Sequence, residues 1–414
     1  MGILPWFMWS VSSLFVVLNY VQQILPTVIT AQLAETLNAS ETTLGFISAA
    51  YFFAYAAFQM PVGLVLDRYG IRLPLTIAIL VAGFGTLVFS QAHSTLEGLV
   101  ARLLMGSGFA FSFLGCLKLV HGWFPASRFS TLAGMTNTVA MLGASCGAPI
   151  ALLVRDLGWR QTLLMTAIAT LLLAFVVLAV VKDPRLSKVQ KGTDRPASGL
   201  PDITGLLRDP QVWMNACYAT SISLIFAAFG GLWGGDFIQK RYGLDEIDSA
   251  AVNSLLFIGG IAGSLFFGWC SDHFNSRKKP MMGASLAGLL TLGALLYLPH
   301  LSLRAFQVCL VMTGFFSSAN ILSYARARDL SPQAVGYSIG FLSTCFYAGN
   351  AASQPVIGYL LEIHSKASGN AAHGVTMADY HFALSFLEIS MLVGVILSFR
   401  IQENRVLLDD PAAQ

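Results

Sequence analysis

Long apolar runs, each of about 18 to 25 residues, alternate with short polar stretches along the whole chain. A helical run of this length crosses the hydrocarbon core of a bilayer, so each run predicts one transmembrane helix. We expect an all-α membrane protein with twelve transmembrane helices in two pseudo-symmetric six-helix bundles. The predicted spans are residues 6–30, 43–66, 73–90, 96–119, 129–154, 162–181, 213–237, 250–270, 280–298, 305–324, 334–361 and 381–399.

The composition excludes an ordinary soluble enzyme. Of the 414 residues, 55% are hydrophobic and only 11% are charged, whereas soluble domains carry about 25% charged residues. The net charge of +3 includes no basic tract, so the lipid bilayer, and not a nucleic acid, is the expected partner. The six cysteines occur singly along the chain, which predicts neither a disulfide framework nor a metal site.

The positive charges predict the orientation in the membrane. If the N-terminus is cytoplasmic, 17 of the 24 lysines and arginines lie on the cytoplasmic side, as the positive-inside rule favours. Both termini are therefore expected in the cytoplasm. The 17 residues are Arg68, Arg72, Lys118, Arg128, Lys182, Arg185, Lys188, Lys191, Arg195, Arg208, Arg277, Lys278, Lys279, Arg326, Arg328, Arg400 and Arg405.

One long polar interval, residues 182–210, divides the spans six and six. It predicts a cytosolic linker between an N-terminal bundle at 1–181 and a C-terminal bundle at 211–403, with a cytosolic tail at 404–414.

The two halves repeat one another. Gly63, Asp67 and Arg72 recur 205 positions later, at Gly268, Asp272 and Arg277. An internal duplication of this kind is typical of alternating-access transporters, in which two similar bundles rock about a shared central site.

Three motifs carry a resemblance to a known family. The junction of the second and third spans, from Gly63 through Asp67 and Gly70 to Arg72, resembles motif A of the major facilitator superfamily. Arg102, with glycines four and six positions later, resembles motif B. The fifth span resembles a degenerate motif C, because Pro149 lies one place late and the final glycines are replaced.

The resemblance implies a conformational gate on the cytoplasmic side. Asp67 would face the start of the eleventh span near Ser331, where the positive end of a helix dipole favours an anion. Asp272 would face the start of the fifth span near Ser127. The alternative is that these charges only set the topology. The proposed gate residues are Gly63, Asp67, Arg68, Arg72, Gly268, Asp272 and Arg277.

Ionisable residues inside the spans are candidates for function. An arginine at the centre of a bilayer raises the free energy of insertion by about 2.5–3.5 kcal/mol, so Arg102 is expected to face the bundle interior. It could bind substrate or tune a proton carrier, or alternatively extend to the membrane edge beside Glu97. Glu388 and Asp236 are the carboxylates available for proton coupling, although Glu388 could equally form a structural hydrogen bond and Asp236 could be a solvated helix end.

Polar and aromatic side chains in the spans that line the family's cavity are candidates for substrate binding. Asn19 and Gln23 share a helix face at i, i+4. Each candidate could instead pack or bond between helices. The full set is Asn19, Gln23, Arg102, Asn137, Phe226, Trp233, Tyr347, Asn350 and Gln354.

The resemblance implies a monomeric, proton-coupled secondary transporter that works by rocker-switch motion. It would take up a small polar solute of the amino-acid, nucleoside or organic-anion class across a bacterial inner membrane, with no cofactor and no metal. Three short stretches, beginning at Lys118, Gly158 and Gln354, resemble bacterial amino-acid and nucleoside importers. The alternatives are a proton-antiport exporter of drugs or siderophores, and a non-transporting membrane receptor.

Overall fold

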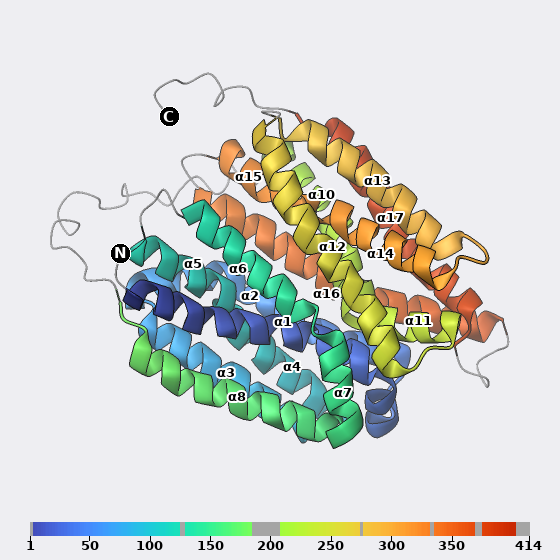
Figure 1. The fold of residues 1–414 in the computed structure, drawn as a ribbon, viewed down its shortest axis with the longest axis horizontal. Coiled ribbons are helices and arrows are strands. Elements are labelled where there is room, and N and C mark those ends of the chain that lie inside the picture. Colours follow the sequence, from blue (N-terminus) through green and yellow to red (C-terminus); the bar gives the residue numbers. More distant parts are fainter. Residues whose placement is uncertain are drawn as a thin grey trace.

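The computed structural model describes residues 3–124, 129–183, 208–273, 276–331, 335–368 and 375–402. All regular secondary structure in these ranges is helical (Figure 1). The N-terminal half contains α1 (Ile3–Leu37), α2 (Glu41–Tyr69), α3 (Arg72–Ser90), α4 (Thr95–Phe109), α5 (Phe111–Trp123), α6 (Phe129–Ala144), α7 (Gly147–Leu157) and α8 (Trp159–Val180). The C-terminal half contains α10 (Pro210–Leu224), η3 (Ile225–Trp233), α11 (Gly234–Tyr242), α12 (Glu246–His273), α13 (Lys278–Tyr297), α14 (Leu303–Ser317), η4 (Ser318–Asn320), α15 (Ile321–Leu330), α16 (Val335–Ala367) and α17 (Met377–Arg400).

Within the described ranges, eleven helices or continuous helix series are long and apolar enough to cross a membrane. They match eleven of the twelve predicted spans. The remaining prediction, residues 334–361, corresponds to α16, which is 33 residues long and packs along α2. Buried amides such as Asn350 and Gln354 make α16 more polar than the other spans.

Successive spans run antiparallel, which defines two faces of the molecule. The linker side carries the start of α1, the end of α17 and the two ends of the 182–210 interval (Figure 1). The distal side carries the end of α1 and the starts of α2, α12 and α14. Most of the 182–210 interval lies outside the described residues, as does the whole of the 404–414 tail.

Close helix packing in the N-terminal half explains the motif B glycines. A Cβ atom at Gly106 of α4 would lie 2.1 Å from the carbonyl oxygen of Tyr51 in α2. Because real Cβ contacts are longer than this, only glycine lets α4 approach α2 so closely. This approach holds Arg102, one turn earlier on α4, against α1 and α2.

Three spans are interrupted near their middle. The fifth span breaks between α6 and α7, where Pro149 cannot donate a hydrogen bond to Ser145. The seventh span contains η3, a π-helix of nine residues. The tenth span contains the short 3-10 helix η4. Such irregular turns leave backbone carbonyls for side chains to satisfy, and they are frequent at functional sites.

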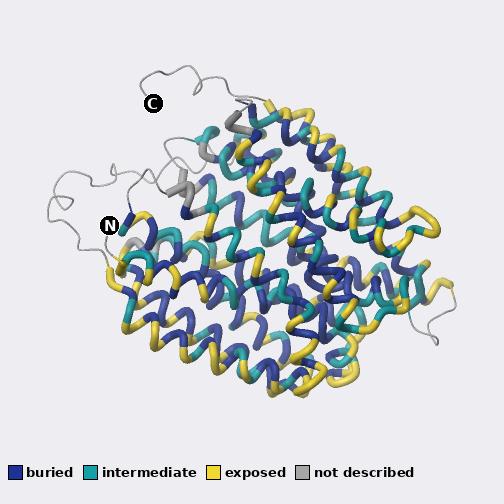
Figure 2. Tube along the Cα trace, viewed as in Figure 1, coloured by how far each residue is buried: buried dark blue, intermediate teal, exposed yellow. Residues whose placement is uncertain are grey.

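Large apolar side chains cover the outer faces of the bundle. Leu290 of α13 and Phe175 of α8 are 67% and 65% exposed, and exposed positions follow the outer helices (Figure 2). In water such a surface would be unfavourable, so it indicates contact with lipid. Buried residues concentrate between the helices (Figure 2).

Candidate substrate site between the two halves

A hydrogen-bonded network centred on Asn19 joins α1, α2 and α5. The Asn19 amide is fully buried. It donates to Oγ of Ser112 at 3.0 Å and accepts from Nε2 of Gln23 at 3.0 Å and from the hydroxyl of Tyr51. Asn19 and Gln23 therefore share a face, as their spacing predicts, and Asn19 orients two neighbouring polar side chains.

Tyrosines surround this network and bridge the two halves of the protein. The rings of Tyr55 in α2 and Tyr347 in α16 lie 4.2 Å apart between centroids, and the rings of Tyr51 and Tyr55 are stacked at 6.2 Å. The hydroxyls of Tyr20 and Tyr324 lie close enough to interact electrostatically with that of Tyr347. We call these five residues the tyrosine cluster: Tyr20, Tyr51, Tyr55, Tyr324 and Tyr347.

Four members of the tyrosine cluster were missed by the sequence analysis, which identified only Tyr347. Gln59, one turn beyond Tyr55 and interacting with it, was also missed. Tyr51, Tyr55 and Gln59 are spaced i, i+4, i+8 on the second span. That polar stripe on an apolar helix was the signal available.

A second group of polar side chains satisfies the backbone of the π-helix η3. Nε2 of Gln354 donates to the carbonyl of Ala227 at 2.9 Å, and Nε1 of Trp233 donates back to the carbonyl of Gln354 at 3.2 Å. Thr27 of the N-terminal half donates to the carbonyl of Gly230 at 3.1 Å. Trp233 and Gln354 thus hold η3 against α16, and Thr27 ties it to α1.

Two amide oxygens on α16 are buried without hydrogen-bond partners among the described residues: Oδ1 of Asn350 and Oε1 of Gln354. They lie one turn apart on the helix that also carries Tyr347. A Cβ atom placed on Gly231 would lie within 4 Å of both Nε2 of Gln354 and the carbonyl oxygen of Gln23. Buried acceptors of this kind are costly unless they are bonded, so they are suited to a ligand that carries hydrogen-bond donors.

Two further predicted residues lie at the edges of this region. Phe226 of η3 is half-buried, and its ring lies 5.9 Å from that of Phe257 in α12. Asn137 of α6 is half-buried and is not part of the described hydrogen bonds around Asn19. Contact of either residue with a substrate stays a prediction.

Arg102 faces the bundle interior, as expected, and is 1% exposed. Its guanidinium donates to the carbonyls of Gln22 in α1 at 3.0 Å and Ser48 in α2 at 3.3 Å, and it lies 4.6 Å from the ring centroid of Tyr51. These contacts tie three helices together behind the tyrosine cluster. A direct role for Arg102 in substrate binding stays a prediction.

The two candidate proton-coupling carboxylates lie away from the tyrosine cluster. Asp236 of α11 accepts from the Tyr380 hydroxyl at 2.5 Å and forms an ion pair with Lys240 at 2.6 Å. Glu388 of α17 is half-buried beside Gly293 of α13, and its Oε2 atom has no partner among the described residues. Their role in coupling stays a prediction.

The two halves are joined tightly on the distal side. Glu362 of α16 accepts from the backbone N–H of Thr42, in the first turn of α2, at 2.8 Å. Gln32 of α1 donates to the carboxylate of Glu246 in α12 at 2.9 Å. A carboxylate at the start of a helix is favoured by the helix dipole, so Glu362 stabilises closure of this side.

Gly45 marks the closest backbone approach on the distal side. A Cβ atom there would lie 2.6 Å from Cα of Pro355 in α16. On the linker side, by contrast, a Cβ atom at Gly63 of the same helix would meet no atom of the described residues within 4 Å, and the same holds for Gly268. The structure therefore has α2 and α16 in close backbone contact at Gly45, whereas the motif A glycines have no such contact with the described residues.

The predicted gate residues have separate environments. Arg68 lies over the ring of Tyr69. Arg72 donates through Nε to the carbonyl of Leu178 at 2.8 Å. Arg277 forms an ion pair with Asp329 at 3.5 Å. The side chains of Asp67 and Asp272, with Ser127, lie outside the part of the chain that can be described.

Sequence reasoning missed one anchor beside the motif A loop. Asp183, at the start of the predicted linker, accepts at Oδ1 from the backbone N–H of Ile71 at 2.5 Å and of Arg72 at 3.1 Å. These are donors at the start of α3, where a carboxylate is favoured. Asp183 thereby ties the first residues of the predicted linker to the motif A loop.

Comparison with known proteins agrees with this architecture. The sequence profile of the Major Facilitator Superfamily matches residues 11–353. A probable galactarate/D-glucarate transporter of Bacillus subtilis is 22% identical over 94% of this chain and 92% of its own, and a membrane sensor protein of Salmonella typhimurium, UhpC, is 24% identical over 78% of both. A solved bacterial homologue of the human lysosomal transporter Spinster has a TM-score of 0.75 at 14% identity over 96% of both chains, which shows a shared fold. The protein is a multi-pass membrane protein and a secondary transporter, not an enzyme, and the chain belongs to the Major Facilitator Superfamily.

Proposed function

We propose that this transporter takes up a small, polar, donor-rich solute into the cytoplasm through the tyrosine cluster and the adjoining face of α16. The observation that carries this proposal is the pair of buried amide oxygens on Asn350 and Gln354 that have no hydrogen-bond partner among the described residues. Hydroxyl or amino groups of a ligand can donate to these two oxygens, while the tyrosine hydroxyls and the Gln23 amide can donate or accept. Aromatic faces from Tyr55 and Tyr347 would pack against its carbon skeleton.

The solute class follows from the same chemistry. Amino acids, nucleosides and polyhydroxylated organic acids all present hydroxyl or amino donors. The Bacillus subtilis relative is named for galactarate and D-glucarate, which are hydroxyl-rich. We therefore place sugar acids first in the panel of candidate solutes and keep amino acids and nucleosides beside them.

Transport requires the distal contacts to open when the linker side closes. The Glu362–Thr42, Gln32–Glu246 and Thr27–Gly230 bonds all join the two halves, and they would have to break. In the opposite conformation, Gly63, Asp67, Arg68 and Arg72, with Gly268, Asp272 and Arg277, would form the gate on the linker side. We place that side in the cytoplasm because it carries most of the basic residues.

Proton coupling completes the proposal, with Glu388 and Asp236 as its carriers. A buried carboxylate oxygen on Glu388 without a described partner is suited to hold a proton. Glu388→Gln should therefore abolish accumulation driven by a pH gradient while leaving solute counterflow intact. Loss of both activities together, in a variant of unchanged thermal stability, would contradict a coupling role.

The test of the transport proposal is a counterflow assay in proteoliposomes with sugar acids, amino acids and nucleosides. For a solute that is carried, Asn350→Ala should raise KM at least ten-fold, because a buried acceptor for the solute is removed. Ser353→Ala is the matched control, since its hydroxyl bonds only locally, to the Asn350 carbonyl. Equal effects of the two substitutions would contradict the proposed site.

Two other functions would give different experimental outcomes. A sensor, as the Salmonella typhimurium relative is named, would bind a solute, seen as thermal stabilisation, without any flux. An exporter, which the degenerate motif C favours, would deplete the solute from whole cells under a pH gradient instead of concentrating it.

A further inference from the structure

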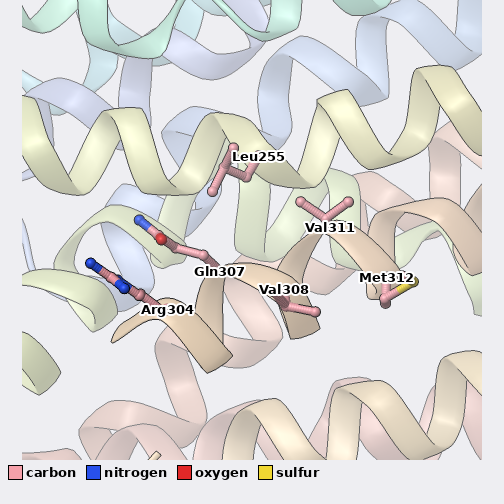
Figure 3. Close-up of a pocket in the computed structure, with 6 residues that line it drawn as sticks. All are labelled: Leu255, Arg304, Gln307, Val308, Val311 and Met312. Atoms are coloured by element: carbon pink, nitrogen blue, oxygen red, sulfur yellow. The ribbon is translucent and has the colours of Figure 1, made fainter. Parts of the chain in front are cut away.

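A groove runs along the outside of the C-terminal half, between α12 and α14 (Figure 3). It consists of two adjoining hollows of about 370 and 430 Å³ that share Leu255 and Gln307. Val308 is 58% and Met312 is 42% exposed, so this groove opens toward the surroundings of the protein. It is separate from the tyrosine cluster, which lies between the halves.

Charged and polar groups mark one end of the groove. Arg304 lies in the first turn of α14 and Asp248 in the first turn of α12. Both helices begin on the distal side, so these side chains lie at that membrane edge. Arg304 and Gln307 extend toward the same end (Figure 3). Among the described residues, neither Arg304 nor Asp248 belongs to an ion pair.

Apolar side chains line the rest of the groove. Val308, Val311 and Met312 follow Arg304 along α14, and Leu255 of α12 faces them (Figure 3). Seven residues of helix separate Arg304 from Val311, a depth of about 10 Å into the membrane. The groove therefore has a charged end at the membrane edge and an apolar wall below it, the order of groups in a phospholipid.

We propose that this groove binds a phosphatidylethanolamine molecule from the distal leaflet. The Arg304 guanidinium and the Gln307 amide would donate to the phosphate, and the Asp248 carboxylate would accept from the ammonium group. One acyl chain would lie along Leu255, Val308 and Val311. The choice of this lipid rests on charge complementarity, because a cation and an anion, neither of them in an ion pair with a described residue, lie at the same end of one apolar groove.

Native mass spectrometry of the purified full-length protein tests this directly. The protein is presented with equal amounts of phosphatidylethanolamine and phosphatidylglycerol, and bound lipid is counted for each variant. We expect phosphatidylethanolamine to bind preferentially and Arg304→Gln to reduce its binding at least five-fold. Val308→Trp should do the same by filling the groove, and Asp248→Asn should remove the preference over phosphatidylglycerol.

Arg155→Gln is the matched control, because Arg155 is also an exposed arginine near the distal end of its helix, α7, with a side chain 61% exposed and paired to Asp156. Its lipid binding should equal that of the unaltered protein. Equal binding of both lipids by the unaltered protein would overturn the assignment to phosphatidylethanolamine. Unchanged binding in Arg304→Gln and Val308→Trp would overturn the groove itself. Each variant is first checked for a melting temperature within a few degrees of the unaltered protein.

Discussion

Pro26 leaves the carbonyl of Gln22 without its helical donor, because proline has no N–H to give four residues later. Arg102 supplies the missing donor from α4, at 3.0 Å. The motif B arginine is thus explained by a defect in a neighbouring helix. It also bonds Ser48 and lies over the ring of Tyr51, so the same side chain supports the tyrosine cluster from behind.

This explanation predicts that the contribution of Arg102 to stability depends on whether residue 26 is proline. Arg102→Gln should lower the free energy of unfolding by about 1–3 kcal/mol, because a buried carbonyl loses its partner. In a Pro26→Ala background the restored N–H can bond Gln22, so the same substitution should cost less. Thermal unfolding of the four proteins measures this coupling.

Additive effects of the two substitutions would contradict the proposed role of Arg102 at Gln22. Arg160→Gln serves as a control for loss of an arginine that bonds carbonyls elsewhere, at Ser90 and Ala92. Its cost should be independent of residue 26.

At the scale of elements, α2 and α16 form an extensive contact between the two halves, and we expect this contact to govern which side is closed. These two helices meet across the halves, with the backbone in contact at Gly45 and Pro355 and no described atom close to Gly63. The two glycines lie near opposite ends of one helix. Substitutions at these two positions therefore test the distal side and the linker side of the same transporter separately.

Alanine at these two positions should have different effects on the observed conformation. Gly45→Ala places a Cβ atom against the backbone of α16, at a cost of about 1–3 kcal/mol, which corresponds to a 5- to 150-fold change in the ratio of conformers. Gly63→Ala adds a methyl group that meets no atom of the described residues and should leave the distal side closed. Spin labels at Leu96→Cys and Leu298→Cys, exposed distal positions of the two halves, measure the distance in a background without other cysteines.

We expect a longer distal distance for Gly45→Ala and the parental distance for Gly63→Ala. Distal separation in both variants, or in neither, would contradict this account of α2 and α16.

At the scale of the whole molecule, charge asymmetry predicts how the bundle is oriented in the membrane. Basic residues such as Arg72, Lys182, Lys278 and Arg400 lie at the linker side, while the distal side pairs or caps many of its charges, as in the Glu362–Thr42 contact. Basic segments resist transfer across the membrane during insertion.

Reporter fusions test the predicted orientation. If this end is cytoplasmic, as the positive charges predict, a green fluorescent protein fused after Arg400 should fluoresce, and an alkaline phosphatase fused after His93, in the distal turn before α4, should be active. The reverse pattern would show that the molecule is inserted the other way.

The sequence by itself determined the spans, their number, the repeat and the family. The hydropathy and the charge of a segment depend only on its own residues, so they can be calculated without knowing which helices pack against it. The same reasoning located Asn19 with Gln23 on one helix face and Asn350 with Gln354 on another, because i, i+4 spacing is local geometry. The interior orientation of Arg102 also followed from the sequence, because exposing an arginine to lipid is unfavourable in free energy.

Only the tertiary structure decided which of these side chains meet. Tyr55 and Tyr347 lie almost 300 positions apart, and their contact depends on how far two helices in different halves are rotated. The π-helix η3, the Glu362 contact with α2 and the capping of α3 by Asp183 depend likewise on packing between elements. Hydrophobic periodicity specifies which face of a helix turns inward, but the partner it meets is set by close packing of all the helices together.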